Sequence, residues 1–153
     1  MDLIEYLQQQ RVSFERLQHP TAYTAQALAA QQHVPGRYVA KPVLVKADQE
    51  FVLCVLPAPS MVDLDRVAAA LGVESAELAS EDDLARIFPD CELGAEPPFG
   101  HLYGLTTLMD EALSKAEFLL FQAGSHTQAI KISQADYQRL ASPRIVSFAR
   151  AVA

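Results

Sequence analysis

Two runs rich in β-branched and aromatic residues, 38–46 and 50–56, are separated by only three residues. This spacing predicts a β-hairpin. Residues 117–123 and 128–133 form a second such pair around a turn that contains Gly124, which can adopt the positive φ of a tight turn. Two hairpins far apart in one chain predict a sheet-containing fold, and the segments around them decide which one.

Helix-start and helix-stop residues mark out the rest of the chain. Asp2, Thr24 and Asp63 stand before helix-forming runs as N-caps, and Ser80 with Asp83 makes a capping box. We predict helices from residue 3 and over 25–32, 64–71, 81–87, 134–140 and 143–152, and short strands over 12–17 and 105–108. Strands and helices mix without strict βαβ alternation. The sequence therefore predicts an α+β fold, a mixed, partly antiparallel sheet surrounded by helices, as a single domain over residues 1–153.

The net charge and hydropathy of the chain argue against some classes of binding partner. A net charge of -7 over 153 residues argues against a protein that grips long nucleic acid such as DNA through unspecific phosphate contacts. No apolar run approaches the roughly 20 residues that span a bilayer, and the N-terminus lacks a signal-peptide pattern. We expect a cytoplasmic protein with no membrane or DNA partner.

The cysteines and histidines form no recognisable ligand pattern. Cys54 and Cys91 are in no C-x-x-C spacing, and the four histidines show no i, i+4 pairing. These spacings predict no metal site and no cofactor. Cys91 is either an inert free thiol or, if a neighbouring group lowers its pKa, a nucleophile.

The stretch over residues 88–105, FPDCELGAEPPFGHLYGL, combines six glycines and prolines with aromatic and aliphatic residues. Glycines allow positive φ and close approach of the backbone to a ligand, while prolines fix φ and remove N–H donors. The composition predicts a stiff loop with a fixed backbone path. Such a loop is either the wall of a binding site or a structural Ω-loop that covers one end of a sheet.

Lys41 lies in the first predicted strand, on the same face as Val39, Val43 and Val45. A lysine among valines either lines a polar pocket at the end of the core or is an edge charge that deters aggregation. Pro42 favours an edge or a bulge, because it cannot donate a hydrogen bond to a neighbouring strand.

Several short motifs occur in a characteristic order. They are His19-Pro20, Thr24-Ala25, Lys41, the G-x-x-x-P pattern from Gly94 to Pro98, and Ala123-Gly124-Ser125-His126. Over nearly its whole length, the chain resembles the YbaK/prolyl-tRNA synthetase-associated (INS-like) editing domain family. The resemblance implies a freestanding aminoacyl-tRNA deacylase, which hydrolyses the ester of tRNA charged with a wrong, small amino acid. Such editing is needed because a synthetase pocket separates substrates that differ by one methylene by only about 1–3 kcal/mol.

The resemblance also implies roles for individual residues. Lys41 would hold the tRNA 3′ end through a phosphate or ribose contact, and His126 would help to place the terminal nucleotide. Gly94 and Pro98 would shape the amino-acid pocket, with the N–H of Gly94 or Ala95 donating to the ester carbonyl. The substrate's own ribose hydroxyl would assist the attacking water, so no protein base is expected. Further substrate contacts are expected from Gly124, Phe99, Tyr23, Thr24 and His19.

Some of these features have a second interpretation. Helix capping explains Thr24 equally well, and a histidine at a hairpin tip, such as His126, is often only a surface residue. Pro42 stands where many relatives have threonine, so no hydroxyl is expected on that wall of the pocket.

The expected partner is mischarged tRNA, contacted at its acceptor end, with an aminoacyl-tRNA synthetase as a second candidate partner. Two other functions stay open. One is a non-catalytic module of the same fold that binds the tRNA 3′ end or a nucleotide, or acts as an adaptor. The other is a thiol-dependent hydrolase that uses Cys91.

Overall fold

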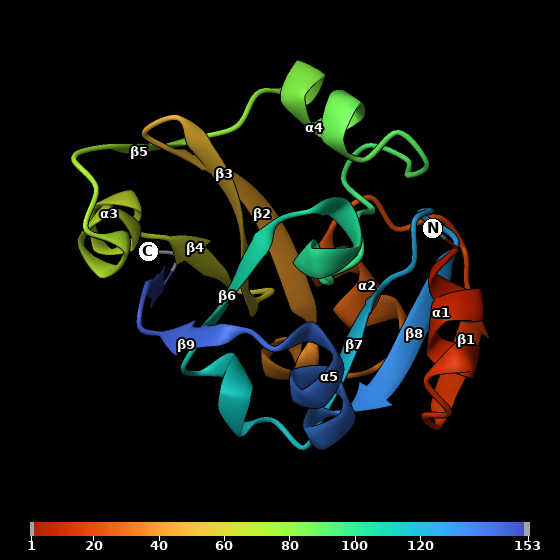
Figure 1. Ribbon diagram of the computed structural model, residues 1–153. Helices are drawn as coiled ribbons and strands as arrows, with labels where there is room; N and C mark the ends of the chain where they lie inside the picture. Colours follow the sequence, from red (N-terminus) through yellow and green to blue (C-terminus); the bar gives the residue numbers. More distant parts are fainter. Residues whose placement is uncertain (1, 152–153) are drawn as a thin grey trace.

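The centre of the molecule is a five-stranded mixed sheet with the strand order β5-β2-β3-β6-β9 (Figure 1). In the computed structural model, which describes residues 2–151, its strands are β2 (Ala40–Ala47), β3 (Glu50–Pro57), β5 (Ala76–Leu78), β6 (Thr106–Asp110) and β9 (Arg144–Val146). The antiparallel pair β2 and β3 is the first predicted hairpin, while β3 with β6 and β6 with β9 are parallel. The predicted α+β class with a mixed sheet is confirmed.

A smaller antiparallel sheet lies beside the first, and two short strands form a separate pair. The three-stranded sheet has the order β1 (Phe14–Gln18), β8 (Gln128–Ser133), β7 (Phe118–Gln122), and the separate pair is β4 (Ser60–Val62) with β10 (Ala149–Ala151). The second predicted hairpin is therefore present as β7 and β8, and Gly124 between them has a φ of 91°. A parallel bridge from Val39 to Leu120 joins the two larger sheets, so the beginning of β2 lies next to β7.

Local capping signals fix most of the helices. They are α1 (Leu3–Gln9), α2 (Ala25–Gln31), α3 (Leu64–Leu71), α4 (Glu81–Ile87) and α5 (Gln134–Ala141), with short 3₁₀ turns η1 (Gly36–Tyr38), η2 (Gly100–Tyr103) and η3 (Leu113–Lys115). Asp2, Thr24 and Asp63 accept backbone N–H bonds at the starts of α1, α2 and α3, and Ser80 begins α4 with a capping box. None of the helices within residues 2–151 has the length and hydropathy that crossing a membrane would need.

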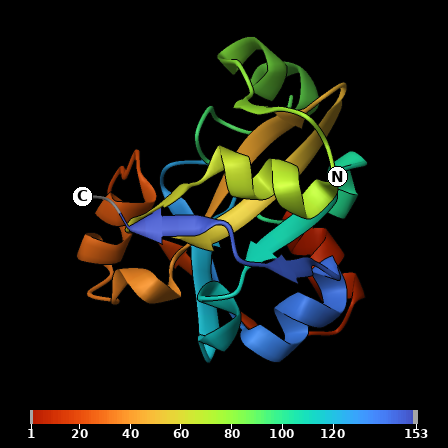
Figure 2. The same ribbon diagram turned by 90° about the vertical axis from the view of Figure 1, so that its left-hand side faces the viewer.

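Three clusters of buried side chains hold the sheets and helices together. The largest lies between the two larger sheets and includes Phe99, Phe121 and Tyr137. On the opposite face of the five-stranded sheet, α3 packs through Val67 against strand residues and Phe148, and Figure 2 shows this helix lying across the strands. The third cluster lies between α2 and the smaller sheet. The start of β2 is close to both α2 and β7, which is where the site described below is found.

The prediction of a C-terminal helix over residues 143–152 is wrong. Within the described residues this segment forms β9 and β10, and residue 152 lies outside them. The cause is a tertiary contact, because one carboxylate oxygen of Asp110 accepts the backbone N–H groups of Phe148 (2.9 Å) and Ala149 (2.8 Å). The fully buried Phe148 ring then fixes the extended path.

Candidate active site

A cavity of about 260 Å³ opens beside the first residues of β2. Here β2 is paired with β3, while β5 on the other side pairs with no residue before Val45. Pro42 pairs with Val55 of β3 but has no partner in β5, so it lies at an edge of the sheet, as expected. The other walls come from the start of α2, the end of β7 and the 88–105 loop. Four of the predicted site residues line this cavity: Lys41, Gly94, Tyr23 and Thr24.

The Lys41 side chain is half-buried, and its position is fixed by backbone carbonyls. Its ammonium group donates to the carbonyl oxygen of Ala58 at 3.1 Å and to that of Ser60. Burial lowers the pKa of Lys41 from its ordinary value of 10.5. An ammonium has three N–H donors, so one remains for a ligand in the cavity.

The 88–105 loop is anchored in the core. Its residues 95–100 are all buried, and the Tyr137 hydroxyl donates to the carbonyl oxygen of Pro98 at 2.7 Å. Phe99 is fully buried, with its ring edge-on to those of Phe121 (5.5 Å) and Tyr137 (5.3 Å). The two interpretations of this loop are compatible, since it closes one end of the core and also forms a wall of the cavity.

Hydrogen bonds within the loop already use the two N–H groups that were expected to meet an ester carbonyl. Gly94, which has a φ of 88°, donates to a carboxylate oxygen of Glu96 at 3.0 Å. Ala95 donates to the carbonyl oxygen of Glu92 at 3.0 Å. In this conformation both N–H groups are used within the loop, so neither is free to donate to a ligand.

His126 lies behind the cavity wall and connects two loops. Its ring nitrogens lie 3.2 Å from the carbonyl oxygen of Ala22 and 2.8 Å from that of Leu93. A neutral imidazole has one N–H, so it donates to one of these oxygens, and the tautomer decides which. The Tyr23 ring packs against the His126 ring with the ring centres 5.1 Å apart. His126 thus positions the cavity mouth without lining it.

The remaining predicted residues lie around the cavity without lining it. The N–H of Gly124 donates to the carbonyl oxygen of Ala95 at 2.8 Å, which joins the β7–β8 turn to the loop. His19 is buried, with a ring nitrogen 2.7 Å from the carbonyl oxygen of Pro20. The predicted site residues that do not line the cavity are Ala95, Pro98, Phe99, Gly124, His126 and His19.

Two buried polar side chains that the sequence analysis did not select also line the cavity. They are Glu96, with 5% of its surface exposed, and Gln122, with 7%. Gln122 could have been found from strand alternation, because it follows Phe118 and Leu120 on one face of β7. Glu96 lies inside the G-x-x-x-P motif, but nothing in the sequence shows which way its side chain points.

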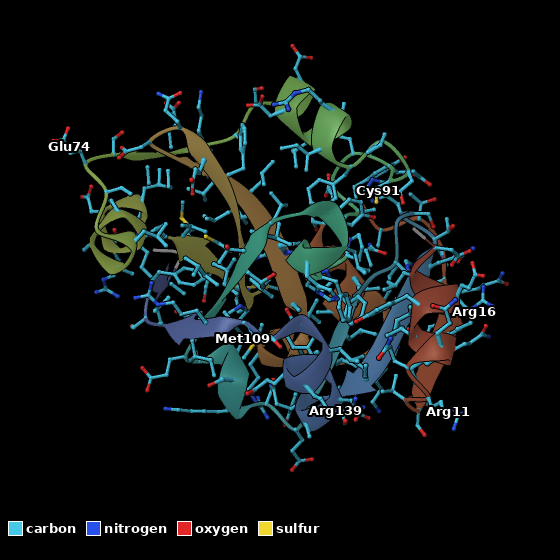
Figure 3. The ribbon with its side chains drawn as sticks, in the orientation of Figure 1. Arg11, Arg16, Glu74, Cys91, Met109 and Arg139 are labelled. Atoms are coloured by element: carbon cyan, nitrogen blue, oxygen red, sulfur yellow. The ribbon has the colours of Figure 1, made fainter. Side chains whose placement is uncertain are left out.

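A larger cavity, of about 450 Å³, lies on the other side of the loop and is lined by Cys91 and Gly124 but not by Lys41 or Gly94. Burial is the main cause that raises the pKa of Cys91, to about 12, so the thiol stays protonated near neutral pH. Figure 3 shows Cys91 in the region of the loop that follows α4. Among residues 2–151, no group of three or more His, Cys, Asp or Glu side chains is arranged to hold a metal ion.

Residues 19–140 match the aminoacyl-tRNA editing domain family. The chain is 28% identical over 153 residues to the multifunctional Ser/Thr-tRNA deacylase ProXp-y of Escherichia coli K12, an alignment that covers 97% of this chain and 91% of the relative. A solved structure described as a candidate trans-editing enzyme for prolyl tRNA synthetase has a TM-score of 0.80 at 15% identity, covering 90% of this chain and 87% of that one. A crystal structure of a hypothetical protein has a TM-score of 0.87 at 13% identity, covering 98% and 100%.

The family match spans Lys41, the Gly94–Pro98 loop and His126. It confirms the resemblance inferred from the motifs, and with it the predicted activity, the hydrolysis of aminoacyl-tRNA. The structural neighbours confirm the fold. The chain belongs to the aminoacyl-tRNA editing domain family.

Proposed function

We propose that the cavity beside β2 holds the aminoacyl ester of mischarged tRNA, and that serine and threonine are the amino acids removed. The observation that carries this proposal is that Lys41 and Gly94 line one cavity of about 260 Å³. This volume is below the roughly 300–1,000 Å³ of pockets for drug-sized ligands, and it suits a small amino acid. The choice of serine and threonine follows the E. coli relative, whose name states these substrates.

Lys41 supplies the positive charge in this proposal. The carbonyl groups of Ala58 and Ser60 hold its nitrogen in place, which leaves one N–H for the ester carbonyl or for the ribose or phosphate of the terminal nucleotide. A donor that is already fixed stabilises the negative charge that develops on the carbonyl oxygen during water attack. The substrate's ribose hydroxyl assists the attacking water.

Tyr23 is placed to bind the terminal adenosine. Its side chain is 73% exposed at the cavity mouth, although the ring packs against His126. Unpaired bases stack on exposed aromatic rings of this kind. We predict that Tyr23→Ala raises KM for aminoacyl-tRNA with little change in kcat, whereas Tyr23→Phe keeps the wild-type KM. Equal KM values for the wild type and Tyr23→Ala would remove Tyr23 from the site.

The test of the proposed function is release of labelled amino acid from one tRNA charged in turn with Ser, Thr, Ala, Cys and 2-aminobutyrate. Faster release of serine or threonine than spontaneous hydrolysis supports the proposal. If tRNA binds but no ester is hydrolysed, the chain is a binding module with the same fold.

A further inference from the structure

Gln122, a side chain of the cavity wall, has a buried hydrogen-bond acceptor without a partner. The side chain is 7% exposed, and it belongs to the cavity wall. Its amide nitrogen donates to the carbonyl oxygen of Ala22 at 2.8 Å. Because a carbonyl oxygen only accepts, this bond fixes the orientation of the amide. The amide oxygen, Oε1, is then buried without a hydrogen-bond partner among residues 2–151.

Three other polar side chains of the cavity, those of Lys41, Glu96 and Thr24, each have a hydrogen-bond partner. The Lys41 ammonium donates to two backbone carbonyls, and a Glu96 carboxylate oxygen accepts the N–H of Gly94. Thr24 accepts the N–H of Ala27 as the cap of α2. Buried acceptors in native proteins nearly always have a donor. Three buried side-chain atoms lack a partner among residues 2–151, and only the Gln122 oxygen belongs to a residue of this cavity, which favours a ligand that brings a donor to this wall.

The surroundings of Gln122 favour a neutral donor. Leu28 and Val39, which also line the cavity, are fully buried, and Ala40 is 2% exposed. The Glu96 carboxylate in the same cavity is the oppositely charged partner that a buried ammonium requires, so the neutral amide oxygen of Gln122, beside this apolar wall, suits a hydroxyl group. This wall fits the carbon atoms of a small side chain together with one hydroxyl.

We propose that Gln122 Oε1 accepts a hydrogen bond from the side-chain hydroxyl of the esterified amino acid, and so selects serine and threonine over alanine and 2-aminobutyrate. This inference rests on the proposed function. A pocket that must pair a buried acceptor rejects the analogue without the hydroxyl, because the acceptor is then left unpaired. We expect a selection on the order of 10- to 100-fold in kcat/KM.

The test compares wild type with Gln122→Met, which keeps the length of the side chain but has no amide oxygen. The substitution also removes the Gln122 donor from the Ala22 carbonyl, whose other contact is a His126 ring nitrogen at 3.2 Å, so the readout must be independent of stability. The readout is the ratio of kcat/KM for Ser over Ala, and for Thr over 2-aminobutyrate, on one tRNA. This ratio does not depend on the fraction of folded enzyme.

We expect ratios of about 10 to 100 in the wild type and close to one in Gln122→Met. Equal rates for the hydroxylated and plain esters in the wild type would overturn the role of Gln122 but leave the deacylase function intact. The same holds if Gln122→Met keeps the wild-type ratio. Hydrolysis of no ester at all would overturn both the proposed function and this inference.

Discussion

Burial in the cavity wall changes the chemical properties of individual side chains. The pKa of Lys41 is lowered by burial, so its ammonium loses its proton at a lower pH than an exposed lysine does. Lys41 was found from the sequence because a lysine among valines is conspicuous. Glu96 was not found, because packing alone determines which way a polar side chain in a loop points, and the strand alternation that could have identified Gln122 was not used.

The pKa of Lys41 predicts a pH dependence. Binding that needs the ammonium should weaken as pH rises through the lowered pKa, before an ordinary lysine would titrate. The measurement is the affinity for a stable amide-linked analogue of seryl-tRNA between pH 7 and pH 10. Lys41→Arg, whose guanidinium stays charged, should remove this alkaline loss. An alkaline loss that is identical in both proteins would contradict the assignment.

Cys91 should not take part in the reaction. With its pKa raised to about 12, the thiol has almost no thiolate at pH 7.5. We expect iodoacetamide to leave deacylation unchanged and Cys91→Ser to keep wild-type activity. Inactivation by iodoacetamide that Cys91→Ser prevents would revive the thiol-dependent hydrolase.

Glu96 has two conceivable roles, and two substitutions separate them. We expect it to hold the loop, because its carboxylate accepts the N–H of Gly94 at 3.0 Å. Glu96→Gln keeps an acceptor oxygen and should stay active, whereas Glu96→Ala should lose activity. Loss of kcat in both variants would instead make Glu96 a general base, which the substrate-assisted mechanism does not require.

Among the helices and strands, those whose bounds depend on neighbouring residues in the sequence were predicted correctly. The bounds of α3 and α4 follow directly from Asp63 with Gly72 and from the Ser80–Asp83 capping box, since a cap acts on residues within one turn. The C-terminal segment was mispredicted because Asp110, distant in sequence, fixes β10. The 88–105 loop was recognised from its composition, but its anchoring to Tyr137 was not visible.

The hydrogen bond from Tyr137 to Pro98 should stabilise the loop. Tyr137→Phe keeps the packing of the ring but leaves the buried carbonyl of Pro98 without this donor. We expect the free energy of unfolding to fall by about 1–3 kcal/mol, measured by urea denaturation. An unchanged unfolding free energy would show that the loop is held by packing alone.

The net negative charge of the whole molecule limits how much of the tRNA surface it can contact. A net charge of -7 disfavours broad contact with the phosphate backbone. We propose that the isolated protein binds mainly the acceptor end and that a synthetase supplies further affinity. Nuclease protection by the isolated protein should be confined to the acceptor end. Protection that reaches the anticodon arm would contradict this proposal.

The most direct test of the site is deacylation of threonyl-tRNA by wild type, Lys41→Ala and Lys46→Ala. Lys46 lies on the same strand as Lys41 but does not line the cavity, so it is a matched control. Loss of one fixed donor to a developing oxyanion typically costs about 10²–10³ in kcat. We predict a loss of this size for Lys41→Ala and wild-type activity for Lys46→Ala, with unchanged thermal midpoints. Wild-type activity in Lys41→Ala would contradict the assignment of this cavity as the active site.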